Sequence, residues 1–176
     1  MKTKVLGKKS KKLNFSGKDL LDSIPRNRKK IEHGIDIWNV YDFMFKDKKE
    51  VPHLKVLEII IPSNSKFIVE SKSMKLYLNS FYDIAFTNQS EILKKIKRDL
   101  KSLIKDDVKL RFIDKFSVEP KNINLNQSNC ETIQRRKIIK FNGFRSICPV
   151  TSQPDFANIY IYSCLLYTSP SPRDLY

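Results

Sequence analysis

The chain has 176 residues, enough for one domain or two small ones, and 40% of them are hydrophobic. Its net charge is +15, and no apolar run reaches the length that a membrane span requires. Three cysteines without paired spacing and two histidines argue against a disulfide framework and a metal centre, and the Lys-rich N-terminus lacks the apolar core of a secretory signal. We therefore expect a soluble, cytoplasmic protein without a metal.

Residues 1–30 form the most basic part of the chain, with eleven lysines and arginines and two aspartates. They carry few apolar residues and are interrupted by glycines and Pro25, which predicts a flexible arm with a short helical turn near residues 18–23. A basic arm can bind the phosphates of nucleic acid, so a nucleic-acid-binding protein is the alternative function. That alternative predicts basic residues interleaved with exposed aromatic residues along a sheet, whereas these charges cluster outside the patterned region.

Two strands are predicted after the arm. Residues 33–46 are rich in β-forming residues and partly alternate between apolar and polar ones. A charged turn follows at residues 46–50, and a second alternating run covers residues 52–61, so together they predict a β-hairpin with one buried face. After a loop at residues 62–65, a short strand is expected at residues 66–69.

A first amphipathic helix is predicted next. Met74, Leu78 and Phe81 recur at helical spacing and fall on one face. Ser71 or Ser73 can cap the N-terminus of this helix with its hydroxyl group.

The start of this helix is also a candidate binding site. Glu70, Ser71 and Lys72 are expected to be exposed there. Backbone N–H groups and the helix dipole favour phosphate or another polar ligand at such a position.

A second helix begins at Asn88, where Asn88 and Glu91 resemble a capping box. Lysines flank its apolar stripe, which consists of Ile92, Ile96, Leu100, Leu103 and Ile104. Residues 107–118 then alternate between apolar and polar residues as a strand does. The order strand, strand, helix, helix, strand predicts an α+β module with both helices on one face of an antiparallel sheet.

The remainder of the chain has a weaker pattern. Residues 119–140 are polar and lack clear periodicity, which predicts a linker with an edge strand at residues 133–141, and Cys130 receives no role. A second unit is expected to begin near residue 141, and residues 156–162 alternate as a strand.

Cys148 lies before that strand in a Pro- and Ser-rich loop, and Asp155 follows seven residues later. A cysteine thiolate is a nucleophile, and a nearby carboxyl group can handle the proton. Pro149 and Pro154 bracket the loop, so both side chains are expected outside regular structure. A buried structural cysteine is the other reading of these residue types.

Two segments carry a family resemblance. The segment from Cys148 to Ile159, Cys-Pro-Val-Thr-Ser-Gln-Pro-Asp-Phe-Ala-Asn-Ile, closely resembles the active-site segment of the NADPH-dependent 7-cyano-7-deazaguanine reductases. These are the nitrile reductases of queuosine biosynthesis, a pathway of tRNA modification. The segment from Glu70 to Tyr77, Glu-Ser-Lys-Ser-Met-Lys-Leu-Tyr, is similar to their second signature nearly residue for residue. The similarity covers residues 31–163 and is strong only at residues 33–45, 67–82 and 145–162.

The order of the two segments resembles the long form of that family, in which two modules are fused. The resemblance implies a tunnelling fold for each module, an antiparallel sheet backed by two helices. On this interpretation residues 31–118 are a complete first module, residues 119–140 a linker and residues 141–163 the start of a second module.

The resemblance also implies a reaction, the reduction of a nitrile to a primary amine with two NADPH. Cys148 would attack the nitrile carbon of 7-cyano-7-deazaguanine and form a covalent thioimide, and Asp155 would supply protons to the nitrogen. Two hydrides would then give 7-aminomethyl-7-deazaguanine. A soft, strong nucleophile suits a nitrile carbon, which is a modest electrophile.

The binding residues are implied in the same way. Val69, Glu70 and Ser71 would contact the deazaguanine, and Ser71 with Lys72 would contact NADPH. A homo-oligomer is expected for the full-length parent, and direct binding of tRNA is not. A zinc-dependent, pterin-forming cyclohydrolase of the same fold is a further alternative, but neither histidine lies near a cysteine.

One departure from the family pattern concerns the C-terminus. The family also uses a downstream His-Glu pair for the purine edge and an Arg-Gly site for NADPH, and no histidine follows His53 in this chain. Residues 164–176 resemble the translation of a sequencing-library adapter and are expected to be an artefact. We therefore expect that the parent protein is the reductase and that this chain is a truncated fragment with little or no activity.

Overall fold

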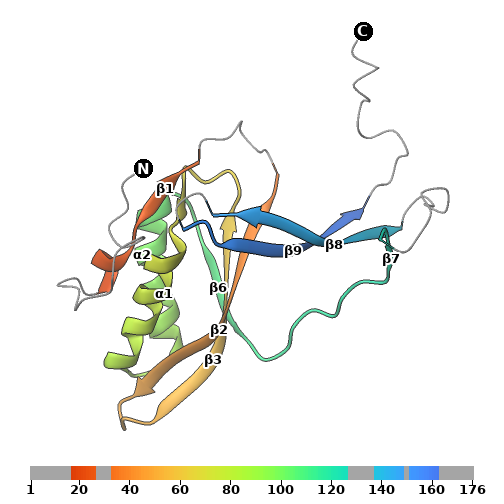
Figure 1. Ribbon diagram of the computed structural model, residues 1–176. Coiled ribbons are helices and arrows are strands. Elements are labelled where there is room, and N and C mark those ends of the chain that lie inside the picture. Colours follow the sequence, from red (N-terminus) through yellow and green to blue (C-terminus); the bar gives the residue numbers. More distant parts are fainter. Residues whose placement is uncertain (1–16, 27–32, 127–136, 149–150, 163–176) are drawn as a thin grey trace. The chain divides into compact units, whose positions relative to one another are not determined.

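The computed structural model of the chain describes residues 17–26, 33–126, 137–148 and 151–162 (Figure 1). The chain divides into two compact units, residues 1–116 and residues 117–176. Within the described ranges, no helix is both long enough and apolar enough to cross a membrane. The structure is α+β, as predicted, with two α-helices and a larger number of strands in the described part.

The first unit is built on a four-stranded sheet in the order β5-β2-β3-β6. The strands are β2 (Ile35–Asp47), β3 (Pro52–Pro62), β5 (Ala85–Phe86) and β6 (Lys109–Ile113). The predicted hairpin is confirmed, because β2 and β3 pair antiparallel. β6 pairs antiparallel with β3, whereas β5 runs parallel to the end of β2. The strand predicted at residues 107–118 is therefore confirmed only in its central part.

The two helices are α1 (Ser71–Asn79), which continues into the 3-10 turn η2 (Ser80–Asp83), and α2 (Gln89–Ile104). Both cover the same face of the sheet, as predicted (Figure 1). The capping prediction for α2 is confirmed, because the Asn88 side chain accepts a hydrogen bond from the Glu91 N–H at 3.0 Å.

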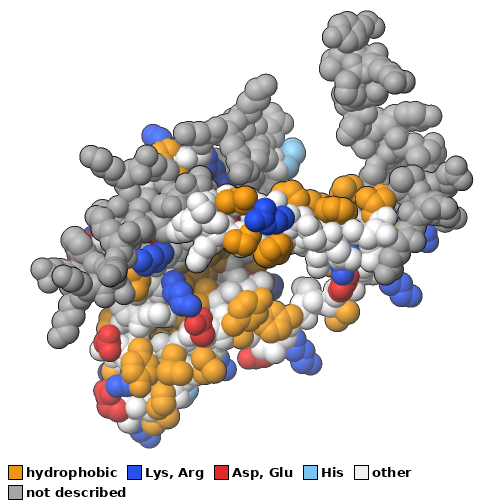
Figure 2. Space-filling model, in the orientation of Figure 1, with side chains coloured by type: hydrophobic (Ala, Val, Ile, Leu, Met, Phe, Trp, Pro, Cys, Tyr) orange, Lys and Arg blue, Asp and Glu red, His pale blue; other side chains and the backbone are white. Residues whose placement is uncertain are grey.

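The hydrophobic core lies between the sheet and the helices. Helix α2 contributes the predicted stripe, except that Leu103 is only partly buried. The fully buried aliphatic residues of the sheet and of α2 are Leu57, Ile59, Ile61, Ile92, Ile96, Leu100 and Ile104. From α1 and η2, Met74, Leu78 and Phe81 are buried as predicted. Hydrophobic side chains are also exposed over the tip of the β2–β3 hairpin (Figure 2), where Met44, Val51 and Leu54 lie.

The N-terminal segment at residues 17–26 corrects the prediction of a flexible arm. It contains the 3-10 turn η1 (Gly17–Leu20), which matches part of the expected helical turn, and strand β1 (Ser23–Pro25). Leu20 and Leu21 are buried in the core of the first unit. Burial of this apolar pair stabilises the segment in the fold. The prediction failed because residues 1–30 were treated as one basic stretch, although residues 17–26 carry no net charge. Residues 1–16 lie outside the described part of the chain.

Strand β1 pairs antiparallel with β4 (Phe67–Val69), the strand that leads into α1. The predicted short strand at residues 66–69 is thus confirmed. This pairing places the N-terminal segment directly beside the start of α1, where the candidate binding residues lie.

The second unit contains a three-stranded sheet in the order β7-β8-β9. Its strands are β7 (Asn122–Asn124), β8 (Ile138–Ile147) and β9 (Pro154–Tyr162). The expected linker at residues 119–140 therefore contains a strand, and β8 is the central strand rather than an edge strand. A three-residue strand is too short to show alternation, which is why the sequence did not reveal β7. Cys130 and residues 164–176 lie outside the described residues.

Candidate functional site

The start of α1 holds the first group of candidate residues. Glu70 precedes the helix with an extended backbone, and its carboxylate accepts hydrogen bonds from the N–H groups of Lys72 at 2.9 Å and Ser73 at 2.8 Å. These N–H groups have no partner within the helix, so the carboxylate supplies one and also offsets the positive end of the helix dipole. The prediction that Ser71 or Ser73 caps the helix is wrong. Glutamate is not among the preferred caps, which explains the error.

The expected exposure of this helix start is wrong for Glu70, which is only 1% exposed. The N-terminal segment accounts for its burial, because the Glu70 N–H donates to the carbonyl oxygen of Asp22 at 2.9 Å. Val69 is also buried, and its side chain belongs to the hydrophobic core. Ser71 is exposed and Lys72 is half-buried, so these two are the accessible members of the group.

Ser73, which the sequence suggested only as a helix cap, has a different structural role. Its hydroxyl group donates to the carbonyl oxygen of Glu70 at 2.8 Å and accepts the N–H of Asp22 at 3.0 Å. It therefore joins the first turn of α1 to the N-terminal segment. Ser73 is fully buried, so this pair of hydrogen bonds is protected from competition with water.

A small cavity opens beside Ser71, between α1 and strand β2. Its volume is about 230 Å³, and its lining includes Trp38, Ser71, Met74 and Leu78. This volume lies below the range of about 300–1,000 Å³ that is usual for pockets of drug-sized ligands. The cavity could therefore hold one part of a ligand beside Ser71 but not a whole dinucleotide.

Cys148 begins the loop between β8 and β9 and is half-buried. Its N–H donates to the carbonyl oxygen of Gln153 at 2.9 Å, and its carbonyl oxygen accepts the N–H of Ser152 at 3.0 Å. Ser152 has a φ of 57°, in the left-handed region that non-glycine residues rarely adopt. The two hydrogen bonds tie the Cys148 backbone to residues 152 and 153.

Asp155 lies on strand β9, directly opposite Ser146 of β8. The expectation that Pro154 and Asp155 belong to an irregular loop is therefore wrong. Two features make proline acceptable at position 154. Among the described strands β9 lies at the edge of its sheet. Pro154 also lies opposite Ile147, next to the hydrogen-bonded pair of Cys148 and Gln153, at a position where the strand needs no N–H donor.

If the alternation of β8 is extended one residue to Cys148, which is hydrogen-bonded to Gln153, we infer that Cys148 and Asp155 share one face of the hairpin. Side chains alternate along a strand, so Ser146 and Cys148 point to one face, and Asp155 faces Ser146. Cys148 and Asp155 are thus diagonal cross-strand neighbours, which are typically about 7–8 Å apart. A small reacting group between them could contact the thiol and the carboxyl group at the same time.

The predicted site residues therefore fall into two groups. Residues 69–72 lie together at the start of α1 in the first unit, and Cys148 and Asp155 lie together on the hairpin of the second. Across the described parts of both units, no three His, Cys, Asp or Glu side chains are grouped as metal ligands would be.

Two comparisons with known proteins agree. Residues 17–112 match the family model described as nitrile reductase, 7-cyano-7-deazaguanine reductase, N-terminal. The chain is 34% identical to the NADPH-dependent 7-cyano-7-deazaguanine reductase of Rickettsia bellii (strain OSU 85-389), over 89% of this chain and 68% of that protein. The family model includes the N-terminal segment and the start of α1.

Two further relatives carry the same name. The protein of Coxiella burnetii (strain RSA 493 / Nine Mile phase I) is 31% identical, over 86% of this chain and 64% of its own length. The protein of Buchnera aphidicola subsp. Schizaphis graminum is 31% identical, over 77% of this chain and 63% of its own length. The chain thus spans about two thirds of the relatives it matches, and these matches do not favour the nucleic-acid-binding alternative.

Proposed function

Because the chain belongs to the family of NADPH-dependent 7-cyano-7-deazaguanine reductases, we propose that it takes part in reducing the nitrile group of 7-cyano-7-deazaguanine. The product would be 7-aminomethyl-7-deazaguanine. The observation that supports this role best is the hairpin that carries a cysteine thiol and a carboxyl group on one face.

In the proposed reaction, the sulfur of Cys148 attacks the nitrile carbon and a carbon–sulfur bond forms. The nitrile nitrogen gains the electron pair and takes a proton from Asp155, which gives a thioimide. NADPH, when bound, supplies a hydride for each of two reduction steps. Between these steps the carbon–sulfur bond breaks, and Cys148 leaves as a thiolate. After the second hydride the nitrogen takes a second proton from Asp155, which has been reprotonated from solvent. Two hydrides and two protons in total thus convert the nitrile to a primary amine.

Asp155 suits the role of the proton donor because its strand is fixed by pairing with β8. A positioned acid contributes roughly 10²–10⁴-fold to a rate. The geometry requires no direct hydrogen bond between thiol and carboxyl group, because the nitrile group would lie between them.

The start of α1 is the proposed ligand-binding element. Ser71 and Lys72 are accessible there and would contact NADPH, where the lysine ammonium group and the helix dipole both favour phosphate. Glu70 would contact the deazaguanine through a second lone pair on a carboxylate oxygen that already holds a helix N–H. Because Glu70 is only 1% exposed, this contact requires the structure that covers it to open. Val69 would contribute beside it, at the end of β4.

We also propose that the chain associates with a second copy of itself. We propose a cytoplasmic location and no direct binding of tRNA. Three large apolar residues of β2, namely Ile35, Ile37 and Tyr41, are more than half exposed. Among the described residues, β5 pairs only with Lys46 and Asp47 at the outer edge of β2, which leaves a long strand edge for another chain.

Protection of Cys148 from alkylation tests the proposed function. Iodoacetamide reacts with accessible thiolates, and the chain has two other cysteines, Cys130 and Cys164, as internal controls. We expect 7-cyano-7-deazaguanine to slow alkylation of Cys148 alone, and guanine, which lacks the nitrile, to protect less. Equal alkylation of Cys148 with and without the nitrile would contradict the proposal.

A further inference from the structure

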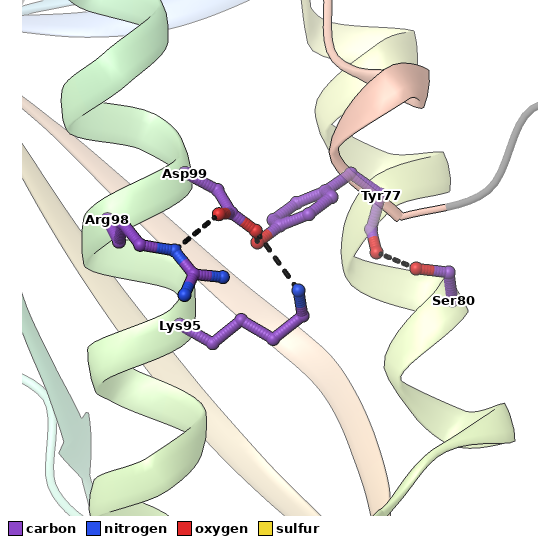
Figure 3. A network of polar contacts seen from close by, with 5 residues as sticks. All are labelled: Tyr77, Ser80, Lys95, Arg98 and Asp99. Carbon is purple, nitrogen blue, oxygen red and sulfur yellow. Dashed lines mark hydrogen bonds and ion pairs between the residues drawn. The ribbon is translucent and has the colours of Figure 1, made fainter.

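A buried hydrogen-bonded network joins α1 to α2 (Figure 3). The hydroxyl group of Tyr77 on α1 donates to Oδ2 of Asp99 on α2 at 2.9 Å. On the α2 side, Lys95 Nζ lies 3.3 Å from the same oxygen and Arg98 Nε lies 3.2 Å from Oδ1. Tyr77 is 0% exposed and Asp99 is 5% exposed.

Stability alone is a weak reason for such a network. Burial opposes the ionised form of Asp99, but the hydrogen bonds from Tyr77 and Arg98 and the charge of Lys95 outweigh it, so its pKa lies below the ordinary value. Replacing buried ionic groups with apolar ones of similar volume is often neutral or stabilising. A buried directional network instead favours one arrangement of the helices over others.

Helix α1 needs such a constraint because it has only nine residues. A helix this short is marginal by itself, so its position depends on its contacts. Apolar packing, such as that of Met74 and Leu78 in the core, is not directional and would tolerate rotation or sliding. Hydrogen bonds to fixed partners tolerate neither.

Two polar contacts on the inner face of α1 fix its position. Ser73 holds the first turn to Asp22, and Tyr77, one turn further on, holds the helix to Asp99. At a rise of about 1.5 Å per residue, Tyr77 lies roughly 7.5 Å along the axis from Lys72. A rotation of α1 that breaks the contact with Asp99 would therefore also turn Ser71 and Lys72 away from their places.

We propose that Tyr77 and Asp99 are positioning residues that hold Ser71 and Lys72 in the orientation in which they bind NADPH. The inference rests on the proposed function, because that function assigns the NADPH contacts to Ser71 and Lys72. Tyr77 and Asp99 are both buried, so they would act through the position of α1 rather than by contact with NADPH.

The first test compares Tyr77→Phe with a matched control, Ser80→Ala. Ser80 follows α1 directly, and its hydroxyl group donates to the carbonyl oxygen of Tyr77 at 2.6 Å, a bond within the same helical segment. NADPH binding to the full chain is measured by fluorescence titration well below the melting temperature of each variant. We expect the Kd of Tyr77→Phe to rise about tenfold and that of Ser80→Ala to stay within about twofold.

Asp99→Asn separates positioning from stability. Its amide oxygen still accepts the Tyr77 hydroxyl, but the ion pairs with Lys95 and Arg98 are lost. We expect a lower melting temperature with an NADPH Kd within about threefold of the parent chain. If Tyr77→Phe binds NADPH as tightly as the unsubstituted chain does, the proposal is wrong.

A second measurement does not depend on any ligand. Hydrogen exchange reports on the N–H groups of Lys72 and Ser73 at the start of α1. Tyr77→Phe is expected to speed their exchange at least severalfold, and Ser80→Ala is not. If the unsubstituted chain does not bind NADPH but Tyr77→Phe speeds the exchange, Tyr77 positions α1 and the assignment of NADPH contacts to Ser71 and Lys72 is wrong. Unchanged exchange in Tyr77→Phe overturns the positioning itself.

Discussion

Glu70 serves the fold as the cap of α1, and we also propose it as a ligand contact. The sequence placed it at the start of a helix, and the resemblance gave it a ligand contact, but its role as the cap came only from the structure. The reason is physical, since a glutamate reaches two backbone N–H groups only when its longer side chain is held in place. The covering N-terminal segment provides that restraint.

Removing this cap should cost stability. Glu70→Ala removes the acceptor of the part-buried Lys72 N–H and of the buried Ser73 N–H, so we expect the free energy of unfolding to fall by about 1–3 kcal/mol. Urea unfolding monitored by circular dichroism measures the change. Glu91→Ala removes an exposed carboxylate that accepts the Thr87 N–H in the first turn of α2, and its cost should be smaller. Equal costs for the two variants would contradict the cap as described.

Tyr77 makes a second prediction at the residue scale, for alkaline pH. Burial, with the charge and hydrogen bond of Asp99, raises the pKa of Tyr77 far above its ordinary value. Above about pH 10 the unfolded chain releases this proton while the folded chain keeps it, so stability falls as pH rises. Tyr77→Phe lacks this loss, and the difference in unfolding free energy between parent and variant should change by up to about 1.4 kcal/mol per pH unit. A constant difference from pH 9 to pH 11 would argue against it.

At the scale of elements, long periodic segments were predictable, whereas among the described short strands only β4 was predicted. The β2–β3 hairpin, α1 and α2 follow from alternation and helical spacing over ten or so residues. Strands β1 and β7 have three residues each and show no period. Asp99 was missed because its charge suggested an exposed position, although helical spacing from Ile92 and Ile96 places it near the apolar stripe of α2.

The ordered N-terminal segment yields an element-scale prediction. Leu21 is 2% exposed in the core, whereas Leu54 on β3 is 61% exposed. Leu21→Ala should lower the free energy of unfolding by about 2–5 kcal/mol, and Leu54→Ala should change it little. Thermal or urea unfolding compares the two variants directly. A negligible effect of Leu21→Ala would mean that the segment belongs to a flexible arm after all.

At the scale of the whole molecule, the two groups of site residues belong to different units of one chain. The sequence located both groups through the family resemblance. The sequence did not reveal that Asp155 lies on a strand, because Pro154 suggested a loop. It also could not show which residues face one another across the hairpin, because that depends on strand register. The catalytic proposal therefore depends on the hairpin, and the binding proposal depends on α1 and the segment that covers it.

Self-association is the prediction at this scale. Ile37 on β2 is 51% exposed beside an edge that β5 does not cover among the described residues, and Val118 is 91% exposed. Ile37→Lys should shift the chain toward the monomer in analytical ultracentrifugation, because a charge on an apolar strand edge opposes strand pairing. Val118→Lys serves as the control and should leave the distribution unchanged. If the unsubstituted 176-residue chain is monomeric at high concentration, the proposed self-association of this chain through the β2 edge is wrong.

Formation of a covalent adduct tests the central claim most directly. The full chain is incubated with 7-cyano-7-deazaguanine without NADPH, so that a thioimide would accumulate, and its intact mass is measured. We predict a mass increase equal to one molecule of 7-cyano-7-deazaguanine per chain. Cys148→Ala should show no such adduct, and Asp155→Asn should form it roughly 10²–10⁴-fold more slowly. An adduct that persists in Cys148→Ala, or that peptide mapping places on Cys130, would contradict the assignment of the nucleophile and with it the proposed reaction.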